Sequence, residues 1–284
     1  MLVSSSGTFV ARDGLEIAYE EWGAGSDGTL IVLVHATGFC KELCAPIVDD
    51  LSELASGFRA LTVDLRAHGD SGVPDHPFDW WDSGKDVVEL VAPGSSPVVG
   101  VGHSAGGAAL ILAELTHPGT FDGLILVEPI VFPPPYGRFP GNPMAEAARR
   151  RRNRFTSREA AFSTWTSKAA FARWEERAMR AYVAGGLRED RGEFVLKCSR
   201  ESEAEFFTAA TEHRAWDRLG EIDVESLVIA GETSTTHQEP FVKEIVGRMS
   251  NASYEIVPDA GHMVWMERPR VVADRVARFI DSVG

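Results

Sequence analysis

Short apolar runs alternate with segments of helical periodicity over most of the chain. Six runs have the length and composition of strands, at residues 30–35, 58–64, 97–102, 123–127, 226–231 and 253–257. Two more, 8–12 and 15–22, flank the turn Asp13-Gly14 and predict a hairpin. Helices are expected at 43–54, 80–91, 105–116, 239–249 and 269–283. This alternation predicts an α/β protein with a mostly parallel, eight-stranded sheet that helices cover on both faces.

The alternation stops after Val131. Residues 132–143 hold five prolines, which predicts a linker. From there to about Ala215 the sequence is helical in pattern, charged and aromatic, with a strand-like run only at 194–197. An insertion at the carboxyl edge of a strand is well placed to be a lid, because ligands bind outside that edge in open α/β sheets. The sequence therefore predicts a first core part, a helical cap and a second core part, at residues 1–133, 134–215 and 216–284.

Composition narrows the classes of function. The 284 residues include 28 Lys or Arg and 42 Asp or Glu, and the net charge of −14 is a poor match to nucleic acid phosphates. No apolar run reaches the roughly 18–20 residues that span a bilayer, and the N-terminus lacks the cationic start of a signal peptide. The three cysteines, Cys40, Cys44 and Cys198, do not suggest a disulfide framework or a metal site. We expect a cytoplasmic protein without nucleic-acid or membrane partners.

The pentapeptide Gly102-His103-Ser104-Ala105-Gly106 follows a predicted strand and opens a predicted helix. This is the setting that a G-x-S-x-G nucleophile elbow requires. Glycines on either side of the serine let neighbouring backbones pass closely, and the sharp turn lifts the hydroxyl clear of the sheet. The helix N-terminus adds positive potential and free N–H groups. The pattern therefore predicts that Ser104 is a nucleophile.

With this motif between a strand and a helix, the chain resembles members of the α/β-hydrolase fold superfamily that have a helical cap. Three further motifs agree with an oxyanion loop, a D-x-R-G-H-G-x-S turn and a C-terminal Gly-His, at residues 35–39 (HATGF), 64–71 (DLRAHGDS) and 259–262 (DAGH). The resemblance covers roughly residues 8–132 and 216–284. It implies a serine hydrolase in which His262 is the base that activates Ser104.

The acid that orients His262 departs from the commonest family pattern. That pattern has an aspartate where this chain has Ser234, in Gly231-Glu232-Thr233-Ser234. Glu128 instead closes the apolar run LILVEP, at the strand from which haloalkane dehalogenases and zearalenone lactonases take their acid. A glutamate that closes a buried strand is costly unless it is paired, so Glu128 is favoured. Glu232 is an alternative, and a site without an acid stays open.

The resemblance also implies an oxyanion hole formed by the amides of Ala105 and Thr37. Three histidines match family positions that are structural, at His35, His68 and His103. His213 and His237 are predicted to be surface residues.

Specificity is expected to lie in the cap. Its aromatic residues Phe155, Phe162, Trp165, Phe171 and Trp174 are spaced for packing, and some suit a hydrophobic acyl pocket. The arginines 149–152 and 154 would point all round a helix, so they predict a solvated face, with carboxylate binding as the alternative. Six residues are predicted to line a substrate pocket, namely Phe39, His103, Phe132, Trp165, Met263 and Trp265.

Taken together, the residues and the resemblance predict a serine esterase or lactonase that acts on a small or medium hydrophobic substrate. No cofactor or metal is expected, and the protein is predicted to be a monomer or homodimer. Two rivals are a cofactor-free oxygenase or C–C bond hydrolase or lyase on the same fold, and a receptor that turns its ligand over slowly. Fold alone does not decide among them.

Overall fold

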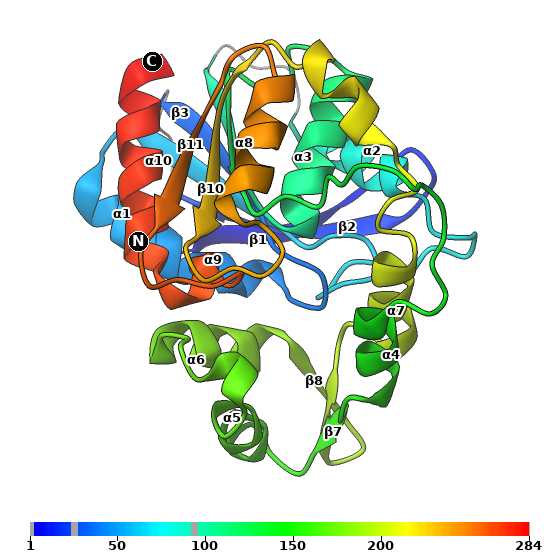
Figure 1. Cartoon of the computed structure of the whole chain (residues 1–284). Coiled ribbons are helices and arrows are strands. Elements are labelled where there is room, and N and C mark those ends of the chain that lie inside the picture. Colours follow the sequence, from blue (N-terminus) through cyan, green and yellow to red (C-terminus); the bar gives the residue numbers. More distant parts are fainter. Residues whose placement is uncertain (1–2, 24–27, 92–95, 284) are drawn as a thin grey trace.

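Figure 1 shows a computed structural model of the chain, in which residues 3–23, 28–91 and 96–283 are described. One sheet runs through the core in the order β1-β2-β4-β3-β5-β6-β10-β11. Its strands are β1 (Val3–Val10), β2 (Glu16–Trp22), β3 (Thr29–Val34), β4 (Phe58–Val63), β5 (Val98–His103), β6 (Gly123–Val127), β10 (Glu225–Gly231) and β11 (Ala252–Val257). β2 pairs antiparallel with β1 and β4, and the other pairs are parallel. The predicted α/β class and eight-stranded sheet are confirmed.

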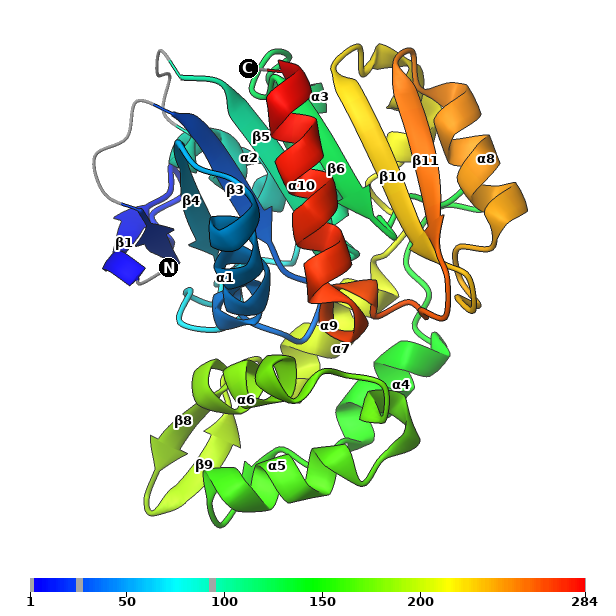
Figure 2. The ribbon, with the colours of Figure 1, turned by 90° about the vertical axis from the view of Figure 1, so that its left-hand side faces the viewer.

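Alternate residues of the central strands pack on opposite faces of the sheet. Ile31 and Leu33 belong to one apolar cluster, and Leu30, Val32 and Val34 belong to the other. Figure 2 shows α1 and α10 in front of the sheet and α2 and α3 behind it. The helices of the core are α1 (Ala45–Leu54), α2 (Trp80–Leu90), α3 (Ala105–Thr116), α8 (Glu239–Arg248), α9 (Val264–Glu267) and α10 (Pro269–Val283), with short 3-10 turns η1 (Lys41–Cys44) and η3 (Ala215–Glu221).

The inserted segment, called the cap below (residues 134–215), is mainly helical. Three of its helices begin at capping side chains, since Asn142, Ser157 and Ser199 accept hydrogen bonds from amides of the first turn. Its elements are α4 (Pro143–Arg150), β7 (Arg154–Phe155), α5 (Arg158–Thr166), η2 (Ala169–Phe171), α6 (Glu176–Gly185), β8 (Leu187–Asp190), β9 (Glu193–Leu196) and α7 (Arg200–Thr208).

The prediction of a cap with a single strand-like run was wrong, because β7, β9 and β8 form a three-stranded antiparallel sheet. Arg191 and Gly192 join β8 to β9 with φ angles of 53° and 82°. Positive φ at both positions suits the right-handed twist of a hairpin. Arginine is an unusual residue at the first of these positions, so no turn was predicted there from the sequence.

The cap lies beyond the carboxyl ends of the parallel strands, with α6 close to the core (Figures 1 and 2). This edge also carries the turn between β5 and α3, the end of β6, and the loops that follow β10 and β11. Residues from these four separate parts of the sequence therefore lie together on the side of the sheet that faces the cap. In the described parts of the chain, no helix combines the length and the apolar character needed to cross a membrane.

Candidate active site

A strained turn between β5 and α3 carries Ser104. Its φ of 54° and ψ of −107° lie outside the regions that side chains favour. Glycines permit the turn, because a Cβ on Gly106 would lie 2.1 Å from the Val34 carbonyl oxygen and one on Gly102 would lie 2.5 Å from Gly106. The Ser104 amide donates to the carbonyl of Val127 at 2.8 Å, which joins the turn to the end of β6. The strand–turn–helix setting expected of the motif is present.

Glu128 directly follows β6 and is completely buried. Its Oε2 accepts hydrogen bonds from His262 Nδ1 at 2.5 Å and Ser234 Oγ at 2.7 Å. Its Oε1 accepts the Gly231 amide at 2.9 Å. Burial by itself would raise the pKa of this carboxyl, but hydrogen bonds and charge interactions with His237 and His262 hold the pKa well below its ordinary value. The structure thus brings an ionised Glu128 against His262.

Among the described residues, no hydrogen bond or ion pair joins the alternative acid, Glu232, to His262. Glu232 is exposed, and its Oε2 accepts the Asp259 amide at 3.1 Å. Ser234, at the position where the common family pattern has an acid, donates its hydroxyl to Glu128 instead. Thr236 extends the same loop, with Oγ1 at 3.2 Å from Glu128 Oε2 and 3.1 Å from His262 Nδ1. The loop after β10 therefore supplies hydroxyls that support the Glu128 carboxylate.

His237 is a site residue that the sequence analysis missed. The prediction of a surface position was wrong, since the side chain is fully buried, with Nδ1 at 3.2 Å from Glu128 Oε2. Its Nε2 lies 2.9 Å from the carbonyl of Pro129 and must donate, because a carbonyl oxygen only accepts. His213 is also buried rather than exposed, and its Nδ1 accepts the Ala215 amide. For His237, the one indication in the sequence was its position in a loop that follows the carboxyl end of a buried strand.

His262 keeps one ring nitrogen for chemistry. With Nδ1 donating to Glu128, a neutral ring carries its lone pair on Nε2. The side chain is 28% exposed. Among the described residues no hydrogen bond joins Ser104 Oγ to His262, and such contacts are often long before substrate binds. His103 donates from Nε2 to the His262 carbonyl at 2.9 Å, and burial, with the nearby charge of His262, lowers the pKa of His103 to about 3.

The backbone amides of Ala105 and Thr37 have no hydrogen-bond acceptor in the described parts of the chain. Ala105 is the first residue of α3, where the helix concentrates partial positive charge. The hydroxyl of Thr37 is also buried without a partner. Because an unsatisfied buried donor is costly, these groups suit a ligand oxygen that bears negative charge.

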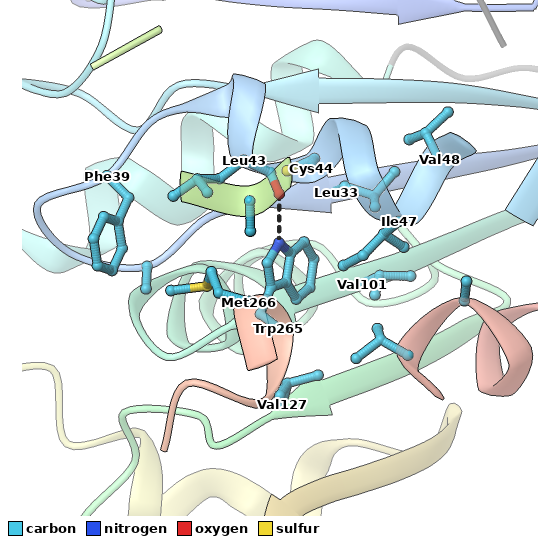
Figure 3. Close-up of a cluster of buried hydrophobic side chains, with 14 of the residues drawn as sticks. Leu33, Phe39, Leu43, Cys44, Ile47, Val48, Val101, Val127, Trp265 and Met266 are labelled. Atoms are coloured by element: carbon cyan, nitrogen blue, oxygen red, sulfur yellow. Dashed lines mark hydrogen bonds between the residues drawn. The ribbon is translucent and has the colours of Figure 1, made fainter. Parts of the chain in front are cut away.

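The predicted pocket residues fall into two groups. Trp165, Trp265 and His103 are enclosed by protein, with exposures of 4%, 1% and 0%. Trp265 donates Nε1–H to the Leu43 carbonyl at 3.1 Å inside the apolar cluster of Figure 3. Trp165 stacks on Tyr182 within the cap, with ring centroids 4.6 Å apart. For these three residues the structure gives a packing position in place of an open pocket wall.

Of the other three predicted pocket residues, Phe39 is a buried member of an apolar cluster, whereas Phe132 and Met263 pack against the clusters from outside. Phe39 contacts the rings of Trp174 and Tyr182 edge-on. Phe132 is half-buried and stacks on Phe241, and Met263 is half-buried. Their pocket role stays a prediction. A cavity of about 390 Å³ within the cap is lined by other residues, among them Phe162, Arg180 and Val183.

Two groups of side chains have the spacing of metal ligands in the described parts of the chain, Glu128–His237–His262 and Asp13–His76–Asp82. In the first, the ligand atoms already pair with one another, as His262 Nδ1 does with Glu128. In the second, the Arg66 guanidinium lies 3.1 Å from Asp13 and supplies the positive charge. Both groups are accounted for by ion pairs within the protein.

Comparisons with known proteins agree with the fold. The model of the alpha/beta hydrolase family matches residues 31–275. The chain is 25% identical over 223 residues to the abhydrolase domain-containing protein ACTT2 of Alternaria alternata, covering 66% of this chain and 84% of that protein. It is 26% identical over 234 residues to the sn-1-specific diacylglycerol lipase ABHD11 of Mus musculus, covering 79% and 72%. The structure of the peroxisomal alpha-beta-hydrolase Lpx1 of Saccharomyces cerevisiae superposes with a TM-score of 0.81 at 18% identity, covering 97% and 84%.

Proposed function

The chain belongs to the alpha/beta hydrolase family, and we propose that it is a serine hydrolase that cleaves a small or medium hydrophobic ester or lactone. The observation that carries the proposal is the buried, ionised Glu128 at 2.5 Å from His262 Nδ1, on the same sheet edge as the strained Ser104. A carboxylate in this position fixes the tautomer of the imidazole and stabilises its protonated form.

In the proposed reaction, His262 Nε2 takes the Ser104 hydroxyl proton as Oγ attacks the substrate carbonyl. The tetrahedral intermediate collapses when His262 returns that proton to the leaving alcohol oxygen, which leaves an acyl ester on Ser104. Water then attacks the acyl carbon, with His262 again acting as base, and Ser104 is released. Glu128 stays ionised throughout and balances the charge of the imidazolium.

The oxyanion of each intermediate would be held by the amides of Ala105 and Thr37, which have no acceptor among the described residues. Donors that are already in place stabilise the transition state without reorganisation. The unpartnered Thr37 hydroxyl is available as a third donor.

The substrate class rests on apolar surroundings and on one relative. Phe132 contacts the ring of His237, Met263 directly follows His262, and Phe39 follows Thr37-Gly38, so apolar side chains adjoin the site residues. The similarity to a protein named a diacylglycerol lipase supports an acyl ester as the bond that is cleaved. A lactone is the same functional group closed into a ring, so the same steps apply.

The proposal is tested by exposing the protein to a serine-directed fluorophosphonate and measuring intact mass, then mapping the modified peptide. We expect one adduct on Ser104 and none in Ser104→Ala. Hydrolysis of p-nitrophenyl butyrate should be lost in the same variant. An unlabelled wild type that is also inactive on the ester would overturn the acyl-enzyme mechanism. Labelling elsewhere than Ser104 would overturn the assignment of the nucleophile.

A further inference from the structure

Gly38, in the loop after β3, is held from two directions. From the core, His68 Nε2 accepts the Gly38 amide at 2.8 Å. His68 Nδ1 lies 3.0 Å from the Arg66 carbonyl and so carries the proton, which leaves Nε2 as the acceptor. From the cap, the Tyr182 hydroxyl donates to the Gly38 carbonyl at 3.2 Å. Both peptide groups of Gly38 therefore have fixed partners, one in each part of the molecule.

The backbone conformation of Gly38 and the absence of a side chain let the cap approach this loop closely. Its φ of +84° is a conformation that side chains rarely adopt. A Cβ at this position would lie 2.7 Å from Glu203 Oε1, so the cap approaches the backbone closely there. Thr37 directly precedes Gly38, and its amide is the proposed oxyanion donor. The Thr37 amide belongs to the Ala36–Thr37 peptide, which the Thr37 Cα joins to the peptide that His68 holds, so a displacement of the Gly38 backbone would also displace Thr37.

The cap side chains that reach this loop form a connected group. Arg151 Nε lies 2.6 Å from Glu203 Oε2, and its Nη1 lies 3.5 Å from the Tyr182 hydroxyl. Arg151 is therefore an exception to the solvated face predicted for the cap arginines. The next loop residue, Phe39, adds ring contacts to Tyr182 and Trp174, with centroids 5.1 Å and 5.4 Å apart.

We propose that Tyr182 is a positioning residue that couples the cap to the oxyanion hole. Its hydroxyl holds the Gly38 carbonyl, and this contact keeps the loop backbone, with Thr37 next to Gly38, in the position that places the Thr37 amide at the oxyanion. The hole is complete only while α6 is docked on the loop. Closure of the cap over a substrate and stabilisation of the transition state are then a single event. This inference rests on the proposed function, because it assigns Tyr182 a part in that reaction.

The test compares Tyr182→Phe with Tyr254→Phe. Both changes remove one hydroxyl, and Tyr254 donates to Glu239 on the far part of the core. With p-nitrophenyl butyrate, Tyr182→Phe should lower kcat about tenfold and leave KM within about twofold, because the lost contact acts on the transition state. Affinity for a trifluoromethyl ketone, whose hemiketal oxygen would occupy the hole, should fall by the same factor. Tyr254→Phe should match wild type in each measurement.

Wild-type labelling by the fluorophosphonate is measured first. If wild type is neither labelled nor active, the proposed function fails and this inference fails with it. If wild type is labelled and Tyr182→Phe keeps its kcat and ketone affinity, only the coupling is overturned. A tenfold rise in KM with kcat unchanged would also overturn the coupling, since that result means weaker substrate binding. Should Tyr182→Phe not fold, Arg151→Gln removes the guanidinium that contacts the Tyr182 hydroxyl, tests the same link and should lower kcat with KM nearly constant.

Discussion

The carboxyl edge of the sheet and the cap each hold a glutamate largely away from solvent, but its surroundings lower the pKa at the sheet edge and raise the pKa in the cap. Glu128 at the sheet edge accepts hydrogen bonds from an amide, two hydroxyls and an imidazole, and the interactions with the histidines outweigh burial and lower its pKa. In the cap, Glu203 faces Arg151 at 2.6 Å without the alignment of a hydrogen bond. Burial there outweighs the cation and raises the pKa of Glu203.

The surroundings of Glu128 therefore suit a catalytic role, whereas those of Glu203 suit a structural role in the contact between the cap and the core. A carboxylate with several fixed donors keeps both its charge and its direction, which is what a developing imidazolium requires. A buried ion pair between two side chains contributes little net stability, yet removing one member leaves an uncompensated charge. We therefore expect changes at Glu128 to act on rate and changes at Glu203 to act on stability.

Glu128→Gln should give the largest effect on activity. The amide keeps the shape of the side chain, but it cannot balance the charge of His262, and its NH₂ group would face Nδ1. We expect kcat/KM for p-nitrophenyl butyrate to fall about 10⁴-fold. A variant that keeps more than a tenth of the wild-type rate would remove Glu128 from the proposed mechanism.

Glu203→Gln is the matched change in the cap. It leaves the half-buried Arg151 without its counter-charge, which should lower the free energy of unfolding by about 2–3 kcal/mol, below the range for a fully buried pair. The activity of the folded fraction should fall far less than in Glu128→Gln. Urea unfolding followed by fluorescence, with kinetics at low urea, separates the two effects. Equal losses of rate in the two variants would contradict the distinction between the regions.

Adding Ser234→Asp to Glu128→Gln tests whether the sheet edge can take its acid from a second strand. Ser234 Oγ lies 2.7 Å from Glu128 Oε2, which is the atom that His262 contacts. A carboxylate at residue 234 should therefore reach the same nitrogen and recover roughly ten- to a hundredfold of the lost kcat/KM. Ser234→Asn in the same background is the control and should recover nothing. A double variant no better than Glu128→Gln would show that the loop cannot present an acid.

The same contrast explains which parts of the site could be predicted from the sequence. The elbow at Ser104 depends only on nearby residues, with glycines at fixed offsets between a strand and a helix. The motif and its flanking residues therefore predict the geometry of the turn. Glu128 was visible because an acid that closes a buried apolar run is costly unless paired. Both signals lie within a few residues of the group concerned.

The residues that the sequence did not reveal depend on contacts between distant segments. His237 meets Glu128 only because β10 lies beside β6 in the sheet. Tyr182 and Glu203 reach Gly38 only through the docking of the cap, and nothing in the aromatic and charged pattern of the cap indicates that contact. Trp265 was placed in a pocket by its closeness to His262 in sequence, whereas α9 turns the ring into the core.

Buried histidines sharpen the comparison through their dependence on pH, and His213 gives the smallest of the expected effects. Burial lowers the pKa of His213 to about 4, whereas the unfolded chain protonates near pH 6.5. Between these values the unfolded state binds more protons, so stability falls as the pH decreases from 6.5 towards 4. His213→Asn keeps an acceptor for the Ala215 amide but cannot take up a proton.

At pH 7.5 this variant should be close to wild type in urea unfolding. At pH 5 it should have lost about 2 kcal/mol less than wild type, since each pH unit below 6.5 is worth about 1.4 kcal/mol for one such group. His76→Asn is the control of opposite sign, because hydrogen bonds to the Pro77 carbonyl and Asp13 raise the pKa of that exposed histidine. Its removal should make acid destabilisation steeper. If His213→Asn and wild type lose stability in parallel down to pH 5, His213 is protonated in the folded protein. That result would contradict a pKa lowered by burial at this histidine.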